Sequence, residues 1–424
     1  MELITEKENK VNSNYRWKIL ALLFFSTTIN YLDRNVLSIL APILQKKYGW
    51  SEMDYGYIIT AFQLAYGLGV IFVGKLLDRF GNRVIFAIAI LAWSLAGMGH
   101  ALAKTVIGFA LARFFLGLGE SANFPASIKT VAEWFPKKER ALATGIFNAG
   151  SNIGAILAPL LIPFIVLNYG WQWAFIFTGF LGVIWLLFWL VSYRVPEKHK
   201  KVSAVELAYI NSDEPEPIAK ISWLKLVVRR ETITICLSRF FTDPVWWFLL
   251  YWLPKFLDKQ YGVGLTGLEI PLITIYIVAD LGGIAGGWLS SHYIKKGMSI
   301  DRSRKRTMLL CALCALPVIF IAQVPPLWVS IGLISLAGAA HCGWAANIFT
   351  LVSDQFPKTA VATIIGISTF AAVLGSVLVS SAVGFVLEKT GSYSLIFATM
   401  GFMYLLGWII IKIGIPRIKS ISFN

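Results

Sequence analysis

Two charged residues inside one apolar segment are the first candidates for chemistry in this chain. The segment begins near Val106 and contains Arg113 and Glu120, which are seven residues apart. Seven residues make two helical turns, so both side chains lie on one face of a helix. A second pair, Asp33 and Arg34, lies inside the first apolar segment. Charged side chains at bilayer depth usually face a wet cavity or a partner rather than lipid. We therefore interpret these four residues as a binding site.

The composition indicates an integral membrane protein. The chain has 424 residues, of which 57% are hydrophobic and 14% charged, and its mean hydropathy is +0.68. Charged residues make up about 25% of an ordinary soluble domain. A membrane-spanning helix needs about 20 mostly apolar residues. Twelve stretches meet this requirement: residues 17–38, 55–73, 84–103, 106–128, 140–165, 172–193, 232–257, 269–292, 307–324, 327–352, 360–386 and 393–415. They are too long for barrel strands, so we predict an all-α integral membrane fold with twelve transmembrane helices.

The charge distribution predicts the orientation of the chain in the membrane. The net charge of +15 could suggest a nucleic-acid partner. Most Lys and Arg residues, however, fall in connections that are cytoplasmic if the N-terminus is cytoplasmic, as the positive-inside rule requires. The polar segment Met1 to Tyr15 runs directly into the first span, so we expect no cleavable signal peptide. We predict a multi-pass protein with both termini in the cytoplasm, a lipid bilayer around it and no nucleic-acid partner.

The chain divides into two halves of six spans each. Residues 194–230 form a long hydrophilic connection, so we predict an N-terminal six-helix bundle at 1–193, a cytoplasmic linker at 194–230 and a C-terminal six-helix bundle at 231–424. The halves repeat at an offset of 221 residues, at which Trp134-Phe-Pro-Lys137 recurs as Gln355-Phe-Pro-Lys358 and Glu120 corresponds to His341. Parallel repeats that hold a substrate between them are typical of alternating-access transporters.

The connection after the second span carries a recognisable motif. It reads Gly74-Lys-Leu-Leu-Asp78-Arg79-Phe-Gly81-Asn-Arg83 and closely resembles the G-x-L-x-D-R-x-G-x-R signature of the major facilitator superfamily. In that family the segment acts as a cytoplasmic latch between the two halves, so the resemblance implies a gating role for these residues. A carboxylate such as Asp78 can lie near a helix N-terminus and interact with neighbouring arginines. The alternative is an ordinary basic turn.

Three further segments indicate a narrower resemblance, which extends over the whole chain. They are Asn30-Tyr-Leu-Asp33-Arg34 in the first span, Arg113-Phe-Phe-Leu-Gly-Leu-Gly-Glu120-Ser-Ala-Asn-Phe-Pro125 in the fourth, and Phe241-Thr-Asp243-Pro-Val-Trp246-Trp247 with Tyr251-Trp252-Leu-Pro254 in the seventh. Together they resemble the anion:cation symporter branch of the superfamily, which moves organic anions with protons or sodium. The seventh span is most similar to that of bacterial hexuronate transporters, which implies a bacterial cytoplasmic membrane.

The charged residues have roles that the residue types and the resemblance suggest together. Arg113 presents a planar guanidinium fork that matches a carboxylate, and the branch motif makes it the arginine that binds the substrate anion. Its alternative role is an ion pair with Asp33 or Glu120. The resemblance assigns proton coupling to Asp33 and Glu120, because a carboxyl in a poorly solvated cavity can bind and release a proton near neutral pH. A carboxyl that alternately pairs with Arg34 and is released could act as the switch. The alternative for both residues is static pairing, which would make them structural.

Aromatic and amide side chains are candidates for binding the body of a sugar. Aromatic faces suit the C–H face of a pyranose, and amides and hydroxyls match its hydroxyl groups. With Arg34 and Arg113, the candidate substrate-binding residues are Tyr31, Tyr66, Asn148, Asn152, Trp246, Trp247, Tyr251, Trp344, Asn347 and Thr369. Because the chain has 16 Trp and 29 Phe, most aromatic residues must pack against lipid or other helices.

Four other residues within the spans keep two interpretations each. Asp243 precedes a proline and either caps or kinks the seventh span or has a function, and Arg239 could pair with it at i, i+4. Asp280 lines the cavity or stabilises the fold. His341 titrates, or is a buried histidine held by a hydrogen bond.

The sequence predicts transport and not catalysis. The four histidines make no metal-ligand spacing and there is no P-loop, so we expect no enzyme, metal or cofactor. We predict a monomeric symporter that takes up a sugar-acid anion, a hexuronate such as glucuronate or galacturonate, with protons rather than sodium. One alternative is a symporter for another small organic anion, such as the aldonate galactonate. The other is a transporter-like sensor, although residues 194–230 are too short for the cytoplasmic domain that a sensor would add.

Overall fold

The computed structural model describes residues 14–212, 223–323, 326–419 and 421, and no β-strand occurs among them. The helices of the N-terminal half are α1 (Tyr15–Tyr48), α2 (Glu52–Phe80), α3 (Asn82–Gly99), α4 (Val106–Glu120), α5 (Asn123–Trp134), α6 (Lys137–Tyr169) and α7 (Trp171–Ser192). Two short helices follow, α8 (Ala204–Ile210) and α9 (Trp223–Val227). The C-terminal half contains α10 (Arg230–Tyr251), α11 (Leu253–Tyr261), α12 (Gly264–Gly267), α13 (Glu269–Lys295), α14 (Ile300–Ala315), α15 (Leu327–Gln355), α16 (Lys358–Thr390) and α17 (Ser394–Gly414). Short 3₁₀ helices extend α3 and α14.

Ten helices among the described residues are long and apolar enough to cross a membrane. The remaining two of the twelve spans are α1 and the pair α4–α5, which are the segments that carry the charged residues. In α1, polar residues such as Asp33 and Arg34 lower the hydropathy of the helix. In the fourth span, α4 has 15 residues and a turn at Ser121 and Ala122 separates it from α5. The predicted all-α fold of twelve transmembrane helices is confirmed.

Local sequence signals explain where the long helices end. The α1 helix ends at Tyr48 and is capped by Gly49, which adopts a φ of 67° that other residues rarely adopt. The next helix begins with a capping box, in which Ser51 and Asp54 satisfy each other's backbone N–H groups. It ends at Phe80 and is followed by Gly81, whose φ of 83° allows the tight connection to α3. These signals keep adjacent spans antiparallel with short connections.

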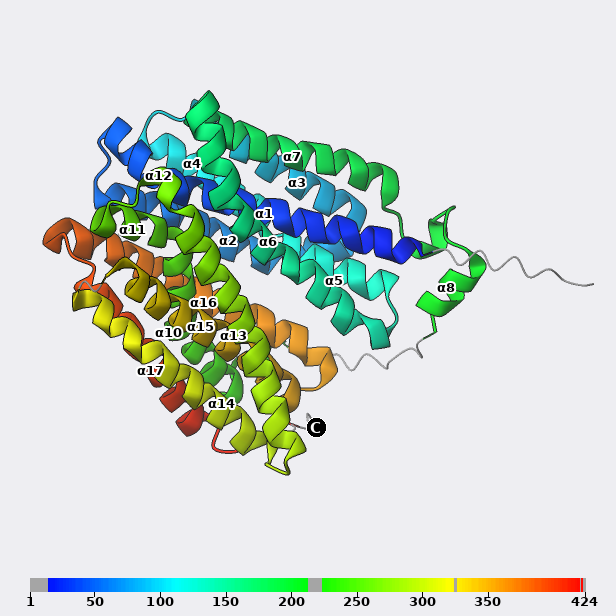
Figure 1. Cartoon of the computed structure of the whole chain (residues 1–424). Coiled ribbons are helices and arrows are strands. Elements are labelled where there is room, and N and C mark those ends of the chain that lie inside the picture. The colour runs from blue at the N-terminus through cyan, green and yellow to red at the C-terminus, as the bar shows by residue number, and fades with distance from the viewer. Residues whose placement is uncertain (1–13, 213–222, 324–325, 420, 422–424) are drawn as a thin grey trace, which may run out of the picture.

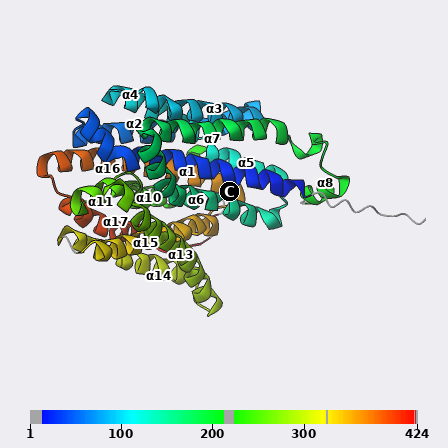
Figure 2. The ribbon, with the colours of Figure 1, turned by 45° about the horizontal axis from the view of Figure 1, so that its top comes forward.

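The helices form two bundles with the same internal packing (Figures 1 and 2). In the N-terminal bundle α1 packs on α6, and α2 packs on α4; in the C-terminal bundle α10 packs on α16, and α13 packs on α15. Each pair occupies the same place in its own half, so the structure has the pseudo-symmetry that the sequence repeat predicts. The bundles contact each other through α2 with α16 and α6 with α13. The exact boundaries at residues 193 and 230 stay a prediction.

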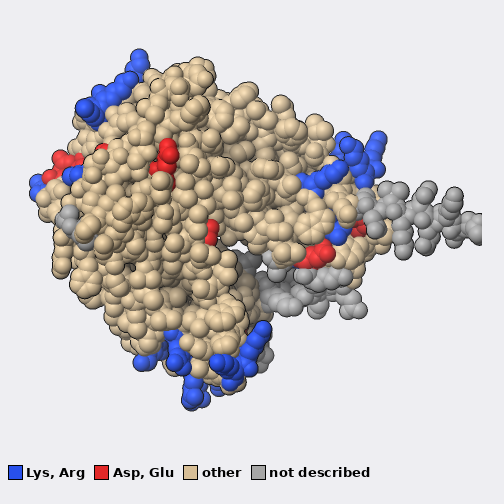
Figure 3. Space-filling model, viewed as in Figure 1, with Lys and Arg blue, Asp and Glu red and all other residues tan. Residues whose placement is uncertain are grey.

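The two bundles meet at one end of the molecule, which we call the far face; it holds the end of α1, the start of α2 and α11. Here Glu52 of α2 pairs with Lys255 and Lys259 of α11, and the Tyr55 hydroxyl donates to the carbonyl oxygen of Tyr251 at 2.5 Å. We call the opposite end, where α1 begins and α17 ends, the terminal face. Figure 1 shows the bundles diverging toward that face, and Figure 3 shows a recess between them on the side of α8.

Equivalent glycines bring helices into close contact in both halves. A Cβ atom added at Gly154 of α6 would lie 2.3 Å from the carbonyl oxygen of Thr28 in α1. One added at Gly375 of α16 would lie 2.0 Å from the carbonyl oxygen of Phe240 in α10. The two glycines are related by the same offset of 221 residues. Small residues at these positions let the helix backbones touch, as is common in membrane proteins.

We expect Gly375→Ala to lower the free energy of unfolding by about 1–3 kcal/mol, because the methyl group would push α16 away from a backbone atom that cannot move alone. The control is Gly366→Ala on the same helix, where nothing lies within 4 Å of the added Cβ. That variant should be as stable as the unsubstituted protein or slightly more stable, since Ala favours a helix. Thermal unfolding in detergent measures both. Equal midpoints for the two variants would contradict the proposed contact.

Candidate functional site

Four buried charged residues form the centre of the N-terminal bundle. Asp33 and Arg34 come from α1, and Arg113 and Glu120 come from α4; none is more than 3% exposed. The Nε atom of Arg34 donates to Oε2 of Glu120 at 2.5 Å, which makes a fully buried ion pair. Burying two charges is costly unless they pair closely, so removing either partner would leave an uncompensated charge inside the bundle. The structure thus brings together the four residues that the sequence singled out.

Arg113 lies next to this ion pair and contacts the backbone of Arg34. Its Nη2 atom donates to the backbone oxygen of Arg34 at 3.1 Å, and its guanidinium carbon lies 5.6 Å from the centre of the Phe62 ring. Neither Nε nor Nη1 has a hydrogen-bond partner. Glu120 pairs with Arg34 and not with Arg113 in this conformation. Arg113 therefore keeps buried donors available, and leaving such donors without an acceptor is energetically costly.

Asp33 points away from Arg34, its neighbour in sequence. Its Oδ1 atom lies 3.9 Å from the position of a Cβ atom added at Gly97 of α3, and Thr178 of α7 also lies close. Neither of its carboxylate oxygens makes a hydrogen bond of 3.5 Å or less. Asp33 thus lies inside the N-terminal bundle, with Arg113 and Glu120 as its charged neighbours.

Aromatic rings from both halves surround the guanidinium group of Arg34. Its central carbon lies 4.8 Å from the ring centres of both Tyr31 and Tyr66, and 5.4 Å from that of Phe62. Trp247 of α10 contributes the C-terminal half, at 6.0 Å. We call these four rings the Arg34 cage. Rings at such distances attract a cation, most strongly when water is excluded.

The cage joins several residues that the sequence predicted separately. Tyr251 extends it, because its ring stacks on Trp247 at 5.7 Å between centres. Phe62 was missed among the candidates, although it lies one helical turn before Tyr66 and so shares its face. The Nη2 atom of Arg34 has no hydrogen-bond partner inside the cage. An acceptor between the halves could therefore bind both the charge and a free donor.

A second polar cluster lies in the C-terminal half. Arg239 donates to Oδ2 of Asp243 at 3.0 and 2.8 Å, so the predicted i, i+4 pair is confirmed. The Nη1 atom of Arg239 also donates to the hydroxyls of Ser368 and Thr369 on α16, both at 2.9 Å. Thr369 therefore faces α10, where it contacts a positive charge. Arg239 was not among the candidate ligands, although an arginine inside an apolar span is itself a signal.

Other predicted residues pack inside the C-terminal half. Trp246 stacks on His341 at 5.0 Å between centres, and Nδ1 of His341 lies 2.8 Å from the Tyr404 hydroxyl, so the histidine is buried and hydrogen-bonded. Trp344 is fully buried with its ring 5.7 Å from that of Tyr404. Both tryptophans thus contact residues of their own half, unlike Trp247 in the Arg34 cage.

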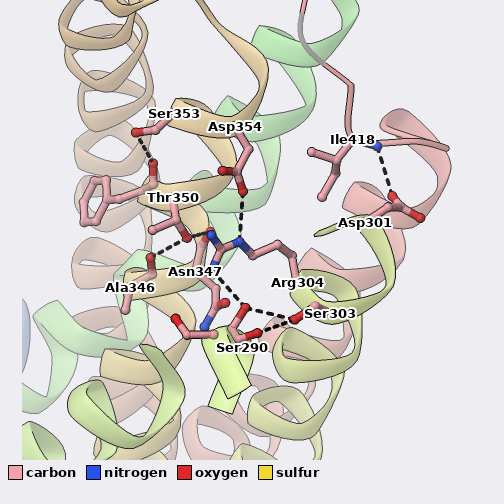
Figure 4. Close-up of polar contacts among 12 residues, drawn as sticks. Ser290, Asp301, Ser303, Arg304, Ala346, Asn347, Thr350, Ser353, Asp354 and Ile418 are labelled. Atoms are coloured by element: carbon pink, nitrogen blue, oxygen red, sulfur yellow. Dashed lines mark hydrogen bonds and ion pairs between the residues drawn. The ribbon is translucent and has the colours of Figure 1, made fainter. Parts of the chain in front are cut away.

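Asn347 lies near a network at the terminal side of the C-terminal half (Figure 4). Its Nδ2 atom donates to the carbonyl oxygens of Gly286 and Gly343, which holds α13 against α15. Farther along, Arg304 of α14 donates to Asp354 at 2.9 Å and to Ser290 at 2.9 Å (Figure 4). These contacts join α13, α14 and α15 within the C-terminal bundle.

Two predicted asparagines lie on α6. Asn148 is exposed, whereas Asn152 is half-buried and lies beside Asp280 of α13. Since α6 and α13 belong to different halves, Asn152 and Asp280 contribute polar groups to the contact between the bundles. Asp280 therefore lies at this contact rather than inside one bundle.

The predicted latch lies at the terminal face. Asp78, at the end of α2, pairs with Lys129 of α5 at 2.6 Å, and Arg83 of α3 donates to the carbonyl oxygen of Leu190 at 2.5 Å. Arg79 is exposed and nothing lies within 4 Å of a Cβ added at Gly74 or Gly81. The observed partners of Asp78 and Arg83 belong to the N-terminal half, so a contact between the halves through these residues stays a prediction.

Comparison with known proteins identifies the family. The model of the Major Facilitator Superfamily matches residues 23–300 and 296–421. The chain belongs to this superfamily. Among solved structures, a D-xylose–proton symporter has a TM-score of 0.74 at 18% identity, covering 93% of this chain and 97% of that one. A bacterial homologue of the human lysosomal transporter Spinster, in an inward-facing and occupied conformation, has a TM-score of 0.72 at 20% identity and covers 95% and 96%.

Relatives of known name are more similar in sequence. A hexuronate transporter of Escherichia coli K12 is 34% identical over 402 residues, which cover 93% of each chain. A galacturonate transporter of Dickeya chrysanthemi is 36% identical over 295 residues, covering 68% of this chain and 86% of that one. A D-galactonate transporter of Escherichia coli O6:H1 is 32% identical over 394 residues, covering 89% and 90%. All three of these relatives are named as transporters and not as enzymes.

We expect Glu120→Ala to lower the free energy of unfolding by about 3–5 kcal/mol, because Arg34 would remain buried without its partner. The double substitution Arg34→Met with Glu120→Leu should restore most of that stability, since no unpaired charge remains. Thermal unfolding in detergent compares the single and double variants. A double variant as unstable as Glu120→Ala would show that the ion pair is not what the single substitution disrupts.

Proposed function

We propose that this protein is a symporter that takes up a sugar-acid anion, a hexuronate such as glucuronate or galacturonate, together with protons. The observation that carries the proposal is the ion pair of Arg34 and Glu120 inside the Arg34 cage, at the contact between the halves. It supplies a fixed positive charge, an exchangeable carboxylate and aromatic surfaces in one place. The named functions of the relatives support the substrate class.

The geometry supports a simple coupling mechanism. Arg34 holds Glu120 through Nε, while its Nη2 atom has no partner. A substrate carboxylate that binds Arg34 competes with Glu120 for the same charge. Glu120 loses its partner as the substrate binds, and a carboxyl buried without a partner is stabilised by taking up a proton. Substrate and proton would then be carried together.

Arg113 provides a second positive charge next to the Arg34–Glu120 ion pair. Its two unpartnered nitrogens can donate hydrogen bonds to a substrate oxygen. Because guanidinium groups remain charged at any working pH, the two arginines exceed the charge of one carboxylate when Glu120 is protonated. A bound anion compensates for that excess, with Asp33 as the nearby acidic group.

The orientation follows from the charged connections. Under the positive-inside rule the terminal face lies in the cytoplasm, so the recess between the bundles faces the cytoplasm. The contacts of Glu52 with Lys255 and Lys259 would then close the outer side. We propose that the protein works as a monomer in the bacterial cytoplasmic membrane, by alternating access around the Arg34 cage.

A second candidate substrate class has support of its own. The relative named as a D-galactonate transporter is 32% identical over most of both chains. An aldonate carries the same carboxylate as a hexuronate but has an open chain, so it would use the arginines in the same way and the aromatic rings differently. Uptake of labelled glucuronate, galacturonate and galactonate into proteoliposomes, with and without a pH gradient, separates the candidates and tests proton coupling. Uptake that does not respond to the pH gradient would refute the coupling.

We expect Glu120→Gln to abolish accumulation driven by a pH gradient while exchange of substrate across the membrane persists. Glutamine can still accept a hydrogen bond from Arg34, but its amide does not bind or release a proton at working pH. Gradient-driven uptake and exchange at equal pH are measured in the same proteoliposomes. Normal gradient-driven uptake in this variant would exclude Glu120 as the proton-carrying group.

We expect Arg34→Lys and Arg113→Lys each to weaken substrate binding by about tenfold or more, because a point charge does not replace a planar fork. Arg302→Lys, at an exposed position on α14, is the control and should bind as the unsubstituted protein does. Binding is measured by isothermal titration in detergent. If only one arginine variant loses affinity, that arginine alone holds the carboxylate; unchanged affinity in both would refute the assignment.

A further inference from the structure

A stripe of polar residues runs along the fourth span from the charged cluster to the terminal face. The fully buried members are Glu120, Asn123, Ser127 and Thr130, and Glu133 follows at the half-buried end. Their spacings of three, four, three and three residues place them on one face of a helix. The turn between α4 and α5 does not interrupt this face, because Ser121 and Ala122 both keep right-handed helical torsion angles.

The upper part of the stripe contacts α1. Asn123 donates to the Thr27 hydroxyl at 3.2 Å and accepts from the Ser26 hydroxyl at 3.2 Å. About two turns further along α1, Arg34 holds Glu120. Asn30 lies between these two contacts on the same helix, three residues after Thr27 and four before Arg34. Its side chain is fully buried, and neither its oxygen nor its nitrogen has a hydrogen-bond partner.

The lower part of the stripe continues to the surface. Asn82, at the start of α3, donates to the Thr130 hydroxyl at 2.6 Å. Both residues lie beside the hydroxyl of Tyr193, which donates to Glu133 in a short hydrogen bond. Glu133 is the member that reaches the terminal face. Hydroxyl, amide and carboxyl groups thus follow one another from Glu120 to the surface without leaving the N-terminal bundle.

Several polar atoms along this line have no partner within the protein. They are Oε1 of Glu120, both polar side-chain atoms of Asn30, Oγ of Ser127 and Oδ1 of Asn82. Buried polar groups are almost always hydrogen-bonded, to protein atoms or to ordered water. Buried water typically binds where several polar atoms lack partners within the protein, as they do along this stripe.

The internal repeat provides a natural comparison. At the offset of 221 residues, Asn123, Ser127 and Thr130 correspond to Trp344, Ile348 and Leu351. All three of these are buried, so the C-terminal half fills the same place with apolar side chains. Helix packing in this fold therefore does not require a polar stripe. The stripe occurs in the half that holds the buried carboxyls.

We propose that this stripe is a water-lined proton path between Glu120 and Glu133, separate from the recess between the halves. The inference rests on the proposed function, in which Glu120 carries the proton. Arg34 and its cage stand between Glu120 and the C-terminal half, so the stripe offers the proton a route that does not pass the substrate. Glu120 releases its proton to the first water or hydroxyl; each relay group accepts one proton and passes on another, and the last proton protonates the Glu133 carboxylate.

The charged and titratable groups around the two ends of the path are fixed by the structure. Near Glu120 they are Tyr31, Asp33 and Arg34 of α1, Arg113 of α4 and Tyr251 of α10. Near Glu133 they are Lys129, Tyr193 and Glu197. The middle of the path, from Asn123 to Thr130, contains no charged member. A proton must therefore cross it through neutral groups.

The test removes hydroxyls from the middle of the path without enlarging any side chain. The variant is Ser127→Ala with Thr130→Val, in the full chain reconstituted into proteoliposomes. Two rates are measured with galacturonate: exchange at equal pH, which needs no net proton movement, and proton flux driven by a galacturonate gradient, followed with a trapped pH-sensitive dye. We expect the proton flux to fall by about tenfold or more, the size of effect that positioned proton-transfer groups have. Exchange should stay within about twofold of the unsubstituted rate.

The matched control is Thr234→Val with Ser376→Ala in the C-terminal half. Both of these hydroxyls are buried and donate to a carbonyl of their own helix. The control should leave both rates within about twofold. Asn30→Leu is a second path variant, with the same number of side-chain heavy atoms but no polar ones, and should reduce proton flux in the same selective way. Unfolding midpoints identify any variant that fails to fold.

The outcomes separate the path from the function on which it rests. If galacturonate moves no protons in the unsubstituted protein, the proposed coupling fails and the path with it. If coupling is present but both path variants reduce exchange and proton flux equally, the stripe serves packing alone and the path is refuted. Unchanged rates in both path variants refute it as well. A selective loss of proton flux supports it.

Discussion

The fold is organised around the cost of placing charge in an apolar interior. Asp33, Arg34, Arg113 and Glu120 are buried inside the bundle, so each charge must be balanced by partners close by. The ion pair of Arg34 and Glu120 balances two of them and joins α1 to the fourth span. The remaining donors of Arg34 and Arg113 are left without acceptors. Nη2 of Arg34 and the Nε and Nη1 atoms of Arg113 are buried donors without an acceptor, so an anion bound here, as proposed for the substrate, would supply hydrogen bonds that the protein does not.

Much of the fold could be predicted from the sequence, because lipid allows few solutions for the backbone. The twelve apolar stretches and the repeat at 221 residues were sufficient for the architecture. The break between α4 and α5 was not predicted, since Ser121 and Ala122 carry no strong breaking signal and the apolar pattern runs through them. Helix ends were also underestimated: α1 extends to Tyr48, because polar residues can continue a helix beyond the lipid core.

The candidate site was predicted less completely, for a physical reason. Charged residues inside spans stand out individually, but which of them pair depends on how the helices are rotated. The sequence allowed Arg113 to pair with Glu120, whereas Arg34 makes that contact. Aromatic residues are harder still, because 14% of the chain is aromatic. Trp247 lies in the Arg34 cage, whereas Trp344 packs against Tyr404. Both are tryptophans inside apolar spans, so the sequence alone does not distinguish them.

The two halves have the same architecture but different buried side chains at equivalent positions. Close contacts at Gly154 and Gly375 keep the crossing of the first and fifth helices of each half alike. At the place of Glu120, however, the C-terminal half has His341, which is held by Tyr404 and stacked on Trp246. A histidine fixed by two partners is a packing element, whereas a carboxylate fixed by one arginine can be released when that arginine binds something else. The half with the releasable group is also the half in which positions 123, 127 and 130 of the fourth span are polar, whereas the equivalent positions 344, 348 and 351 hold Trp, Ile and Leu.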